Sequence, residues 1–384
     1  MMVRLGCGAA VFVAMVLVAG STAALGRAAA PSSVPLSTWQ ANGRVRAIAI
    51  SNGTVYIGGS FTSLMSHGTR RSVVRHHLAA INEATGRPTS WNPNVNGPVD
   101  VLRVIGRRVY VGGSFTSIGG ARVRNLAVVS RQSGRVFPGF HAGANGEVDA
   151  LAASSSRLYV GGVFSRVNGR ARSNLAAVAL RNGALASAWT ARTNGAVHAL
   201  LFSTRTGRVY VGGHFTSVDG AARPFLAAVG GKRGSVFRWA STPLGQVWAL
   251  ALSPRGPLYA GVGGHQGGQL DSYRPLTGRR RWHHFADGDV QTVAIAGSEI
   301  LAGGHFLNAC RGGGGGSPWV CTSPVQRDRL FATNTSGALQ PWNPGANSLY
   351  GVWALRADAS HVDAGGDFTI VHETHQARYV EFLR

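Results

Sequence analysis

The sequence predicts an all-β fold, a seven-bladed β-propeller of four-stranded blades that an N-terminal strand closes by completing the last blade. Three observations indicate it: a strand motif repeats along the chain, its copies are evenly spaced, and the two ends of the chain each hold part of one repeat. The first glycine of each copy advances from Gly58 to Gly365 in steps of about 51 residues, a period typical of solenoids, propellers and arrays.

The repeated motif reads V-Y-V-G-G-x-F-T-S and begins at Val109 in one of its clearest copies. Its β-branched and aromatic run indicates a buried strand, and a glycine pair inside such a strand marks the close approach of another backbone. A strand of the form G-x-V-x-A-L precedes each copy at a spacing that fits a tight turn. The first glycines of the seven copies, of which the last three are weaker, are Gly58, Gly112, Gly161, Gly212, Gly261, Gly303 and Gly365.

Two further strands complete each repeat. The fourth is usually followed by Asn-Gly, which is the expected turn chemistry before the next blade. The third strands centre on Leu78, Leu126, Leu175, Leu226, Leu270, Leu330 and Tyr379. The fourth strands centre on Trp91, Phe140, Trp189, Trp239, Trp282 and Trp342.

The ends of the chain predict how the ring closes. The chain stops at Arg384, just after the seventh third strand, so the last blade lacks its fourth strand. Residues 37–43, around Trp39, have the pattern of a fourth strand and its turn, placed ahead of the first blade. A strand from the N-terminus that completes the last blade would leave only short, protected sheet edges.

The first 30 residues have the pattern of a secretory signal. Arg4 is followed by an apolar run over residues 5–19, and small residues then continue to Ala30. The alternative is an uncleaved membrane anchor, but the apolar run is short for a span. We therefore expect a secreted, extracellular or surface-associated protein with no transmembrane span after cleavage. Residues 31–35 are then a short linker, and residues 36–384 form a single propeller domain.

Two cysteines remain after removal of the signal. Cys310 and Cys321 flank a glycine run in blade six, within an insertion that covers residues 308–324. Export favours a disulfide between them. The alternatives are free thiols or a metal pair, for which no second pair of soft ligands lies at zinc spacing. We expect no metal or cofactor, because His214, His305 and Asp367, which follow glycine pairs, belong to different blades.

One variable position of the repeat is the x of V-x-A-L. This position changes from blade to blade and is never a small apolar residue. Innermost strands line the channel of a propeller, so these side chains should form a ring at its mouth, where convergent polar groups indicate a ligand site. Two tryptophans beside charged groups suit a sugar or a cationic group. The alternative is that the ring only fills and hydrates the channel. Its members are Arg46, Asp100, Asp149, His198, Trp248, Gln291 and Trp353.

The chain is strongly basic, with a net charge of +23 from 38 Lys and Arg against 15 Asp and Glu. Such a charge predicts attraction to polyanions, unless it is only diffuse solubilising charge. For an exported monomer that binds no specific nucleic acid, the expected partner is a glycan or an anionic cell-envelope polymer. The second-to-third loops place a basic rim around the mouth, and its members are Arg71, Arg124, Arg170 and Arg327. The recurring Arg122, Arg172 and Arg223 favour packing against a neighbouring strand or capping of its carbonyls.

One resemblance supports this architecture. The motif V-Y-V-G-G-x-F-T-S, then G-x-x-R-x-N-L-A as in residues 120–127, then W-N-P, resembles the delta-60 repeat of secreted bacterial β-propellers, which are similar to the kelch and galactose-oxidase propellers. The resemblance covers about residues 36–384. It implies a propeller fold and an extracytoplasmic location, and it implies no established chemistry.

Enzymatic signatures are mostly missing, since the chain has no G-x-S-x-G elbow and no calcium-loop motif. The sequence therefore favours a non-enzymatic binding or scaffold module at the cell surface. The alternative is a carbohydrate-active hydrolase or lyase that uses Asp100, Asp149 and His198 at the channel mouth.

Overall fold

The structure is a computed structural model that describes residues 30–384, except for 255, 265–266, 312–320 and 322. The predicted signal segment up to residue 29 and most of the glycine run in the insertion lie outside the described residues. Within the described part, every regular element is a strand, and no helix is long and apolar enough to cross a membrane. The all-β prediction is confirmed.

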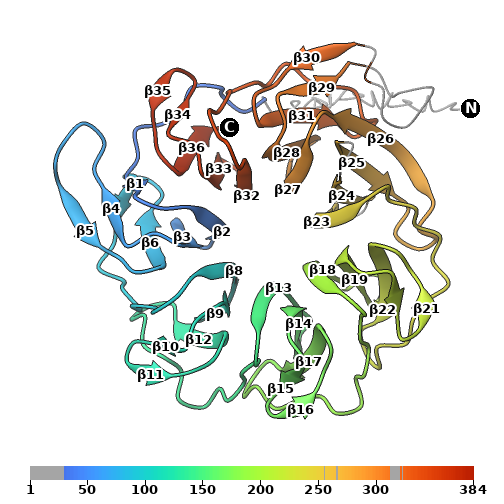
Figure 1. Cartoon of the computed structure of the whole chain (residues 1–384). Coiled ribbons are helices and arrows are strands. Elements are labelled where there is room, and N and C mark those ends of the chain that lie inside the picture. Colours follow the sequence, from blue (N-terminus) through green and yellow to red (C-terminus); the bar gives the residue numbers. More distant parts are fainter. Residues whose placement is uncertain (1–29, 255, 265–266, 312–320, 322) are drawn as a thin grey trace, which may run out of the picture.

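Antiparallel sheets surround a central axis, and the first strand of each lies innermost (Figure 1). The first sheet has the order β2 (Val45–Ile50), β3 (Thr54–Gly59), β6 (Leu78–Asn82) and β7 (Arg87–Pro88). The next three are β8 (Val99–Ile105), β9 (Arg108–Gly113) and β12 (Leu126–Ser130); β13 (Glu147–Ala153), β14 (Arg157–Val163) and β17 (Leu175–Ala179); and β18 (Ala196–Ser203), β19 (Arg208–His214) and β22 (Leu226–Gly230). The others are β23 (Gln246–Leu252), β24 (Leu258–Gly263), β25 (Gly268–Tyr273) and β26 (Arg280–Ala286); β27 (Asp289–Ala296), β28 (Glu299–His305) and β31 (Leu330–Asn334); and β32 (Val352–Ala357), β33 (His361–Gly366) and β36 (Tyr379–Leu383).

The loops between second and third strands form short hairpins in all of these sheets except the one that begins with β23. The hairpins are β4 (Ser63–Met65) with β5 (Ser72–Val74), β10 (Ser117–Ile118) with β11 (Ala121–Arg122), β15 (Arg166–Val167) with β16 (Arg170–Ala171), β20 (Ser217–Val218) with β21 (Ala221–Ala222), β29 (Asn308–Cys310) with β30 (Pro324–Gln326), and β34 (Ile370–Val371) with β35 (Thr374–His375). The pair β29–β30 is the base of the predicted insertion, and it extends the preceding sheet because Ala309 pairs with Ala286 of β26. The predicted disulfide between Cys310 and Cys321 is present.

The glycine pairs let neighbouring sheets approach closely. A Cβ on Gly112 would lie 2.6 Å from the side chain of Val148 in the next sheet, and one on Gly113 would lie 2.2 Å from the carbonyl oxygen of Pro98. The predicted backbone approach is therefore made by the second glycine, and the first one accommodates a valine. Burying such a valine contributes about 1.5–3 kcal/mol. The hydrophobic core is divided into clusters, several of which join neighbouring sheets.

The fourth strands lie earlier in the sequence than predicted. After third strands the pairing consists of β7 or of single bridges at Val136, Leu185, Val236 and Leu339, three or four residues before the predicted aromatic centres. The aromatic residue leaves its own sheet and contacts the next one: Trp91 Nε1 donates to the Ser130 carbonyl at 2.9 Å, and Trp189 Nε1 donates to that of Gly230. Trp282 alone among the predicted centres lies within a described strand, β26.

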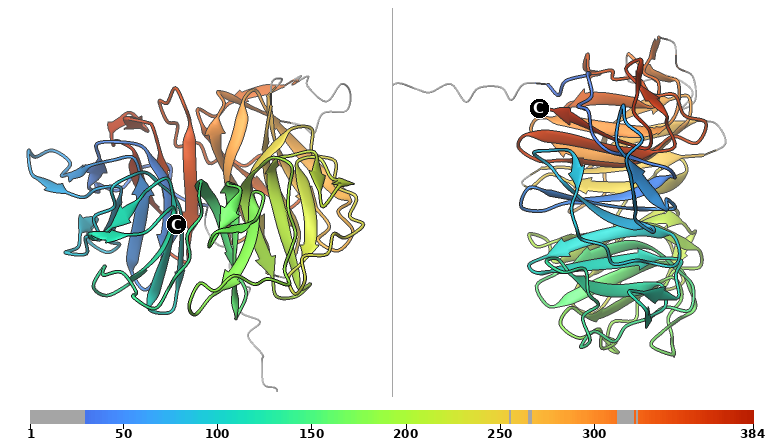
Figure 2. Two further views of the ribbon diagram at one scale, coloured as in Figure 1. Left: turned by 60° about the horizontal axis from the view of Figure 1, so that its bottom comes forward. Right: turned by 90° about the vertical axis from the view of Figure 1, so that its left-hand side faces the viewer.

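The N-terminal segment pairs with the last strand, β36. Pro35 forms a bridge with Phe382, the Ser32 N–H donates to the Leu383 carbonyl at 2.7 Å, and the Leu36 N–H donates to that of Glu381 at 2.8 Å. The first described residues (blue) accordingly lie beside the last strands (red) in Figure 1 and in the right view of Figure 2. The innermost strand β32 packs beside both β27 and β2.

The segment that makes this pairing lies ahead of the one that the sequence predicts. The Trp39 N–H donates instead to the Gly86 carbonyl, and the adjacent β1 (Gln40–Ala41) pairs with β4 of the first sheet. Residues 32–36, which include most of the predicted linker, take the predicted place beside β36. The Asn42 side chain then bonds two backbone N–H groups of the first sheet, those of Thr62 and Ser63.

Candidate functional site

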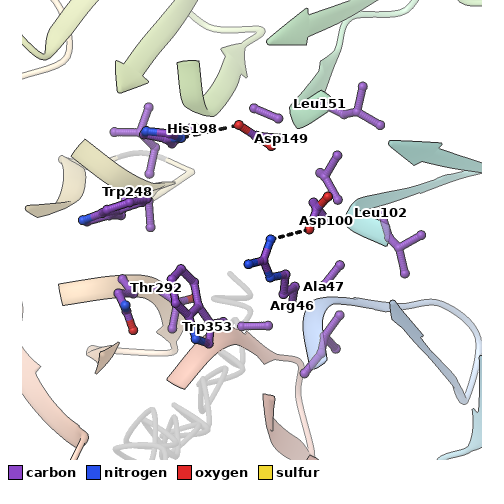
Figure 3. Close-up of a pocket in the computed structure, with 18 of the residues that line it drawn as sticks. Arg46, Ala47, Asp100, Leu102, Asp149, Leu151, His198, Trp248, Thr292 and Trp353 are labelled. Atoms are coloured by element: carbon purple, nitrogen blue, oxygen red, sulfur yellow. Dashed lines mark hydrogen bonds and ion pairs between the residues drawn. The ribbon is translucent and has the colours of Figure 1, made fainter. Parts of the chain in front are cut away.

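A β-bulge places each residue of the predicted ring. Every first strand shifts register against its second strand at one point, for example between Val45 and Ala47 and between Val148 and Ala150. The residue skipped at that point is the x of V-x-A-L, and a bulge re-aims its extra side chain. The bulge residues are Arg46, Asp100, Asp149, His198, Trp248, Gln291 and Trp353. All of them line one cavity of about 150 Å³ at the axis (Figure 3).

Two contacts pair charged and titratable groups across neighbouring sheets. Arg46 Nη1 donates to Asp100 Oδ1 at 2.8 Å, and His198 Nδ1 lies 3.5 Å from Asp149 Oδ2 (Figure 3). The Asp100 side chain is 7% exposed and its other oxygen, Oδ2, has no hydrogen-bond partner among the described residues. The acidic side of the cavity therefore keeps an accepting oxygen that the protein does not use.

Glu147 extends this acidic side, and the sequence prediction missed it. One oxygen each from Asp100, Glu147 and Asp149 lie within 4.8 Å of one another. Burial raises the pKa of Glu147 to about 7, with further increases from the charges of Asp149 and Asp100. Burial also raises the pKa of Asp100, against the lowering effect of Arg46. Near neutral pH the three carboxyl groups together therefore hold a proton. The sequence signal for Glu147 was E-V-D at residues 147–149, because residues two apart on a strand point to the same face.

The aromatic side of the cavity already contacts other side chains. Trp248 stacks on His198 with ring centroids 4.6 Å apart, and Trp353 meets Trp248 edge-on at 6.1 Å. The guanidinium carbons of Arg44 and Arg46 each lie 5.4 Å from the centre of the Trp353 ring. Part of the ring surface that the sequence prediction assigned to a ligand is thus occupied by these protein cations.

An outer layer at the mouth was also missed. Arg44 Nε forms an ion pair with Asp367 Oδ1 at 2.7 Å, and the Arg44 guanidinium lies 5.1 Å from the ring centre of Tyr350. Tyr350 is 56% exposed. These residues come from loops on the mouth side of the first and last sheets, and the repeated motif singles out only Asp367 among them, because it follows a glycine pair.

The arginines of the predicted rim divide into two kinds. Arg71, Arg124 and Arg170 are exposed. Arg327 is partly buried and donates to the carbonyls of Gln326 and Gln340. Its arrangement favours packing over ligand binding.

The same contact, in which an arginine side chain donates to a backbone carbonyl, recurs in other sheets. Arg172 donates to the Ser187 carbonyl and Arg223 to the Phe237 carbonyl, as the packing interpretation of these two residues predicts. Arg122 is exposed. The exposed cationic rim is therefore smaller than the sequence predicts.

Two groups of side chains in the described part of the chain bring three candidate metal-ligand atoms together. One is the acidic side of the cavity, and the other, Glu83 with His361 and Glu381, lies elsewhere. Neither contains His214, His305 or Asp367, which the sequence analysis considered.

Comparisons with known proteins identify the fold. No protein-family profile and no curated protein matches the chain. Among solved structures, the WD40 β-propeller domain of Doa1 superposes with a TM-score of 0.58 at 11% identity, covering 91% of this chain and 96% of that one. The computationally designed Ika8 protein superposes with a TM-score of 0.54 at 14% identity, covering 91% and 92%. The chain has a β-propeller fold. At these identities the similarity concerns the fold alone, and the fold does not determine the function.

Proposed function

We propose that this protein is a secreted, non-enzymatic binding module of the cell surface whose ligand is a glycan, with one sugar unit entering the channel mouth. One observation carries the proposal: the x of V-x-A-L, which changes from blade to blade, is the bulge residue in every sheet, and these seven side chains line one cavity. In most copies the two positions that follow it also line the cavity and keep small or apolar residues. Polar and aromatic diversity at the bulge position favours recognition over packing.

The chemistry of the cavity favours a glycan over an acidic polymer at this place. Its acidic side is formed by Asp100 and Asp149, with Glu147 beside them, and Arg46, which also lines the cavity, is already paired with Asp100. Carboxylates accept hydrogen bonds from sugar hydroxyls and repel polymer anions. The cavity of about 150 Å³ is smaller than the ~300–1,000 Å³ pockets of drug-sized ligands, so it suits one unit of a chain. An anionic polymer fits the exposed Arg71, Arg124 and Arg170 instead.

The proposed architecture is a monomeric ring of seven blades with the delta-60 repeat, closed by the N-terminal segment. Support comes from the pairing of Pro35 with Phe382 and from the contact of Gly365 with Val45, which matches the glycine–valine contacts between successive sheets. The equivalent tryptophans of other sheets, such as Trp91 and Trp189, donate to a carbonyl of the following sheet. The Trp342 indole donates to the Ser32 carbonyl. The signal-like N-terminus and the Cys310–Cys321 disulfide favour export.

A glycan array with the mature chain tests the ligand class. We expect binding to neutral or amino sugars that Trp353→Ala and Asp149→Asn each weaken at least about tenfold, a loss of about 1.4 kcal/mol. Replacing Arg71, Arg124 and Arg170 by Gln is the matched control and should leave this binding unchanged. Binding that disappears between low and moderate salt and ignores the cavity variants would instead assign the ligand to the rim.

A second candidate, a carbohydrate-active hydrolase, rests on the protonated Glu147 beside Asp149, an arrangement that general acid catalysis requires. Release of reducing ends from a bound glycan, abolished in both Glu147→Gln and Asp149→Asn, would establish it. Binding without product release retains the non-enzymatic proposal.

A further inference from the structure

A second group of titratable side chains lies where the first and last sheets meet. Glu83 follows β6 of the first sheet, while His361 begins β33 and Glu381 lies on β36 of the last sheet. His361 Nδ1 is 3.5 Å from Glu83 Oε1, and His361 Nε2 is 3.4 Å from Glu381 Oε1. First strands run away from the channel mouth and second strands return, so this group, which we call the junction cluster, lies at the opposite end of the strands.

Glu381 is the most deeply buried member. Its residue exposure is 0%, and neither carboxylate oxygen has a hydrogen-bond partner among the described residues. Its cross-strand neighbour Asp363 is also 0% exposed and leaves Oδ2 unbonded, although Tyr379 donates to Oδ1 at 2.5 Å. Acids directly opposite each other in a sheet destabilise it, and a buried polar group without a partner costs free energy. Something must compensate these oxygens.

The abundant arginines of the chain do not neutralise the acids of the junction cluster through ion pairs among the described residues. Glu83, Asp358, Asp363 and Glu381 account for four of 15 acidic residues in a chain of net charge +23. Within the described part of the chain, the ion pairs of Glu83 and Glu381 are both made with His361. The nearby Arg384 donates to the backbone carbonyl of Asp358.

We propose that the junction cluster binds one first-row divalent cation, for which Zn²⁺ is the probe. The ligands are one imidazole nitrogen of His361 and one carboxylate oxygen each from Glu83 and Glu381, atoms that lie within 4.8 Å of one another. Imidazole with carboxylates suits Zn²⁺ and its first-row neighbours, whereas Ca²⁺ prefers six to eight oxygen ligands.

The site has a route to solvent and a structural consequence. The side chains of His361 and Glu83 are 16% and 10% exposed, so an ion can reach the buried Glu381 past them. Its ligands come from the first and the last sheet, so a bound ion joins the two ends of the chain. Binding to the folded state alone stabilises it by mass action. We expect Zn²⁺ at about a hundred times its Kd to raise Tm by about 3–5 °C.

Calorimetry on the mature chain, stripped with a chelator and dialysed, tests the site. Titration with ZnCl₂ at pH 7 should show one equivalent bound, with CaCl₂ binding at least about a hundredfold more weakly. Glu381→Gln and His361→Gln should each weaken Zn²⁺ binding at least about tenfold. The matched control Glu147→Gln changes an acid of the cavity and should leave Zn²⁺ binding unchanged.

Thermal unfolding supplies a second readout. Saturating ZnCl₂ should raise the Tm of the wild type and leave that of Glu381→Gln unchanged. Absence of Zn²⁺ binding up to 1 mM, roughly the weak end of useful affinity, would overturn the proposal. So would Zn²⁺ binding that Glu147→Gln abolishes and Glu381→Gln leaves intact.

Discussion

The acidic side of the cavity and the junction cluster are two groups of carboxylates with different counter-charges. In the cavity, Asp100 has a guanidinium at 2.8 Å and Asp149 has His198 at 3.5 Å. At the junction, Glu381 is fully buried and its ion pair is with His361, a group that need not be charged. The pKa of Glu147 rises to about 7 and that of Glu381 to about 8, in both cases chiefly through burial. Asp100 in the cavity is thus paired with an arginine, whereas no lysine or arginine forms an ion pair with Glu381 among the described residues.

The largest expected effect is the pH dependence of the junction. Because the pKa of Glu381 is raised from 4.5 to about 8, the folded state holds a proton that the unfolded state releases. This stabilisation is complete below pH 4.5 and is lost as pH rises toward 8, at about 1.4 kcal/mol for each unit between the two values. We expect the free energy of unfolding in metal-free buffer to fall between pH 5 and 8.5.

Replacing the carboxyl group isolates the contribution of Glu381. Glu381→Gln cannot ionise, so it should be less pH-dependent than the wild type, by several kcal/mol over that interval. Glu147→Gln should remove a smaller part of the pH dependence of the free energy of unfolding, since the pKa of Glu147 reaches only about 7. Urea unfolding at several pH values measures both. Stability of the wild type that rises with pH would contradict the environment described for the junction.

The next effect comes from opening the junction without changing the cavity. A chain that begins at residue 37 lacks the bonds from Ser32 and Leu36 to β36 and the acceptor of the Trp342 indole. Losing three hydrogen bonds at about 0.5–1.5 kcal/mol each predicts a destabilisation of about 2–4 kcal/mol relative to a chain that begins at residue 31. Urea unfolding of the two chains compares them. Equal stabilities would mean that this segment does not hold the last sheet.

The smallest effect tests the balance within the cavity. Arg46→Met leaves Asp100 without its cation, and because the arginine side chain is 33% exposed we expect a loss of about 1–3 kcal/mol. The double variant Arg46→Met with Asp100→Asn should recover part of that loss, which a double-mutant cycle measures. If the single and double variants are equally stable, Arg46 does not compensate Asp100.

Much of the fold follows from local pattern. The repeat predicts the first, second and third strands because β-branched runs and glycine pairs recur at one period, and it identifies the variable position that faces the cavity. Most fourth strands are displaced from the predicted aromatic centres, and aromatic residues such as Trp91 and Trp189 bond across sheet boundaries. Glu147 was missed although E-V-D places it two residues from Asp149, and only the tertiary structure brings Asp100 of the neighbouring sheet beside both.

The sequence by itself determined the all-β repeat and the variable V-x-A-L position, and it favoured a disulfide between Cys310 and Cys321, because each depends on residues that are close in sequence or repeated in register. Only the tertiary structure decided what surrounds each charge. Glu83, His361 and Glu381 are separated by up to 298 positions in sequence, from 83 to 381, and meet because the chain returns to its first sheet. Desolvation and counter-charge depend on such distant neighbours, so they set the chemistry of these carboxyl groups after the fold has formed.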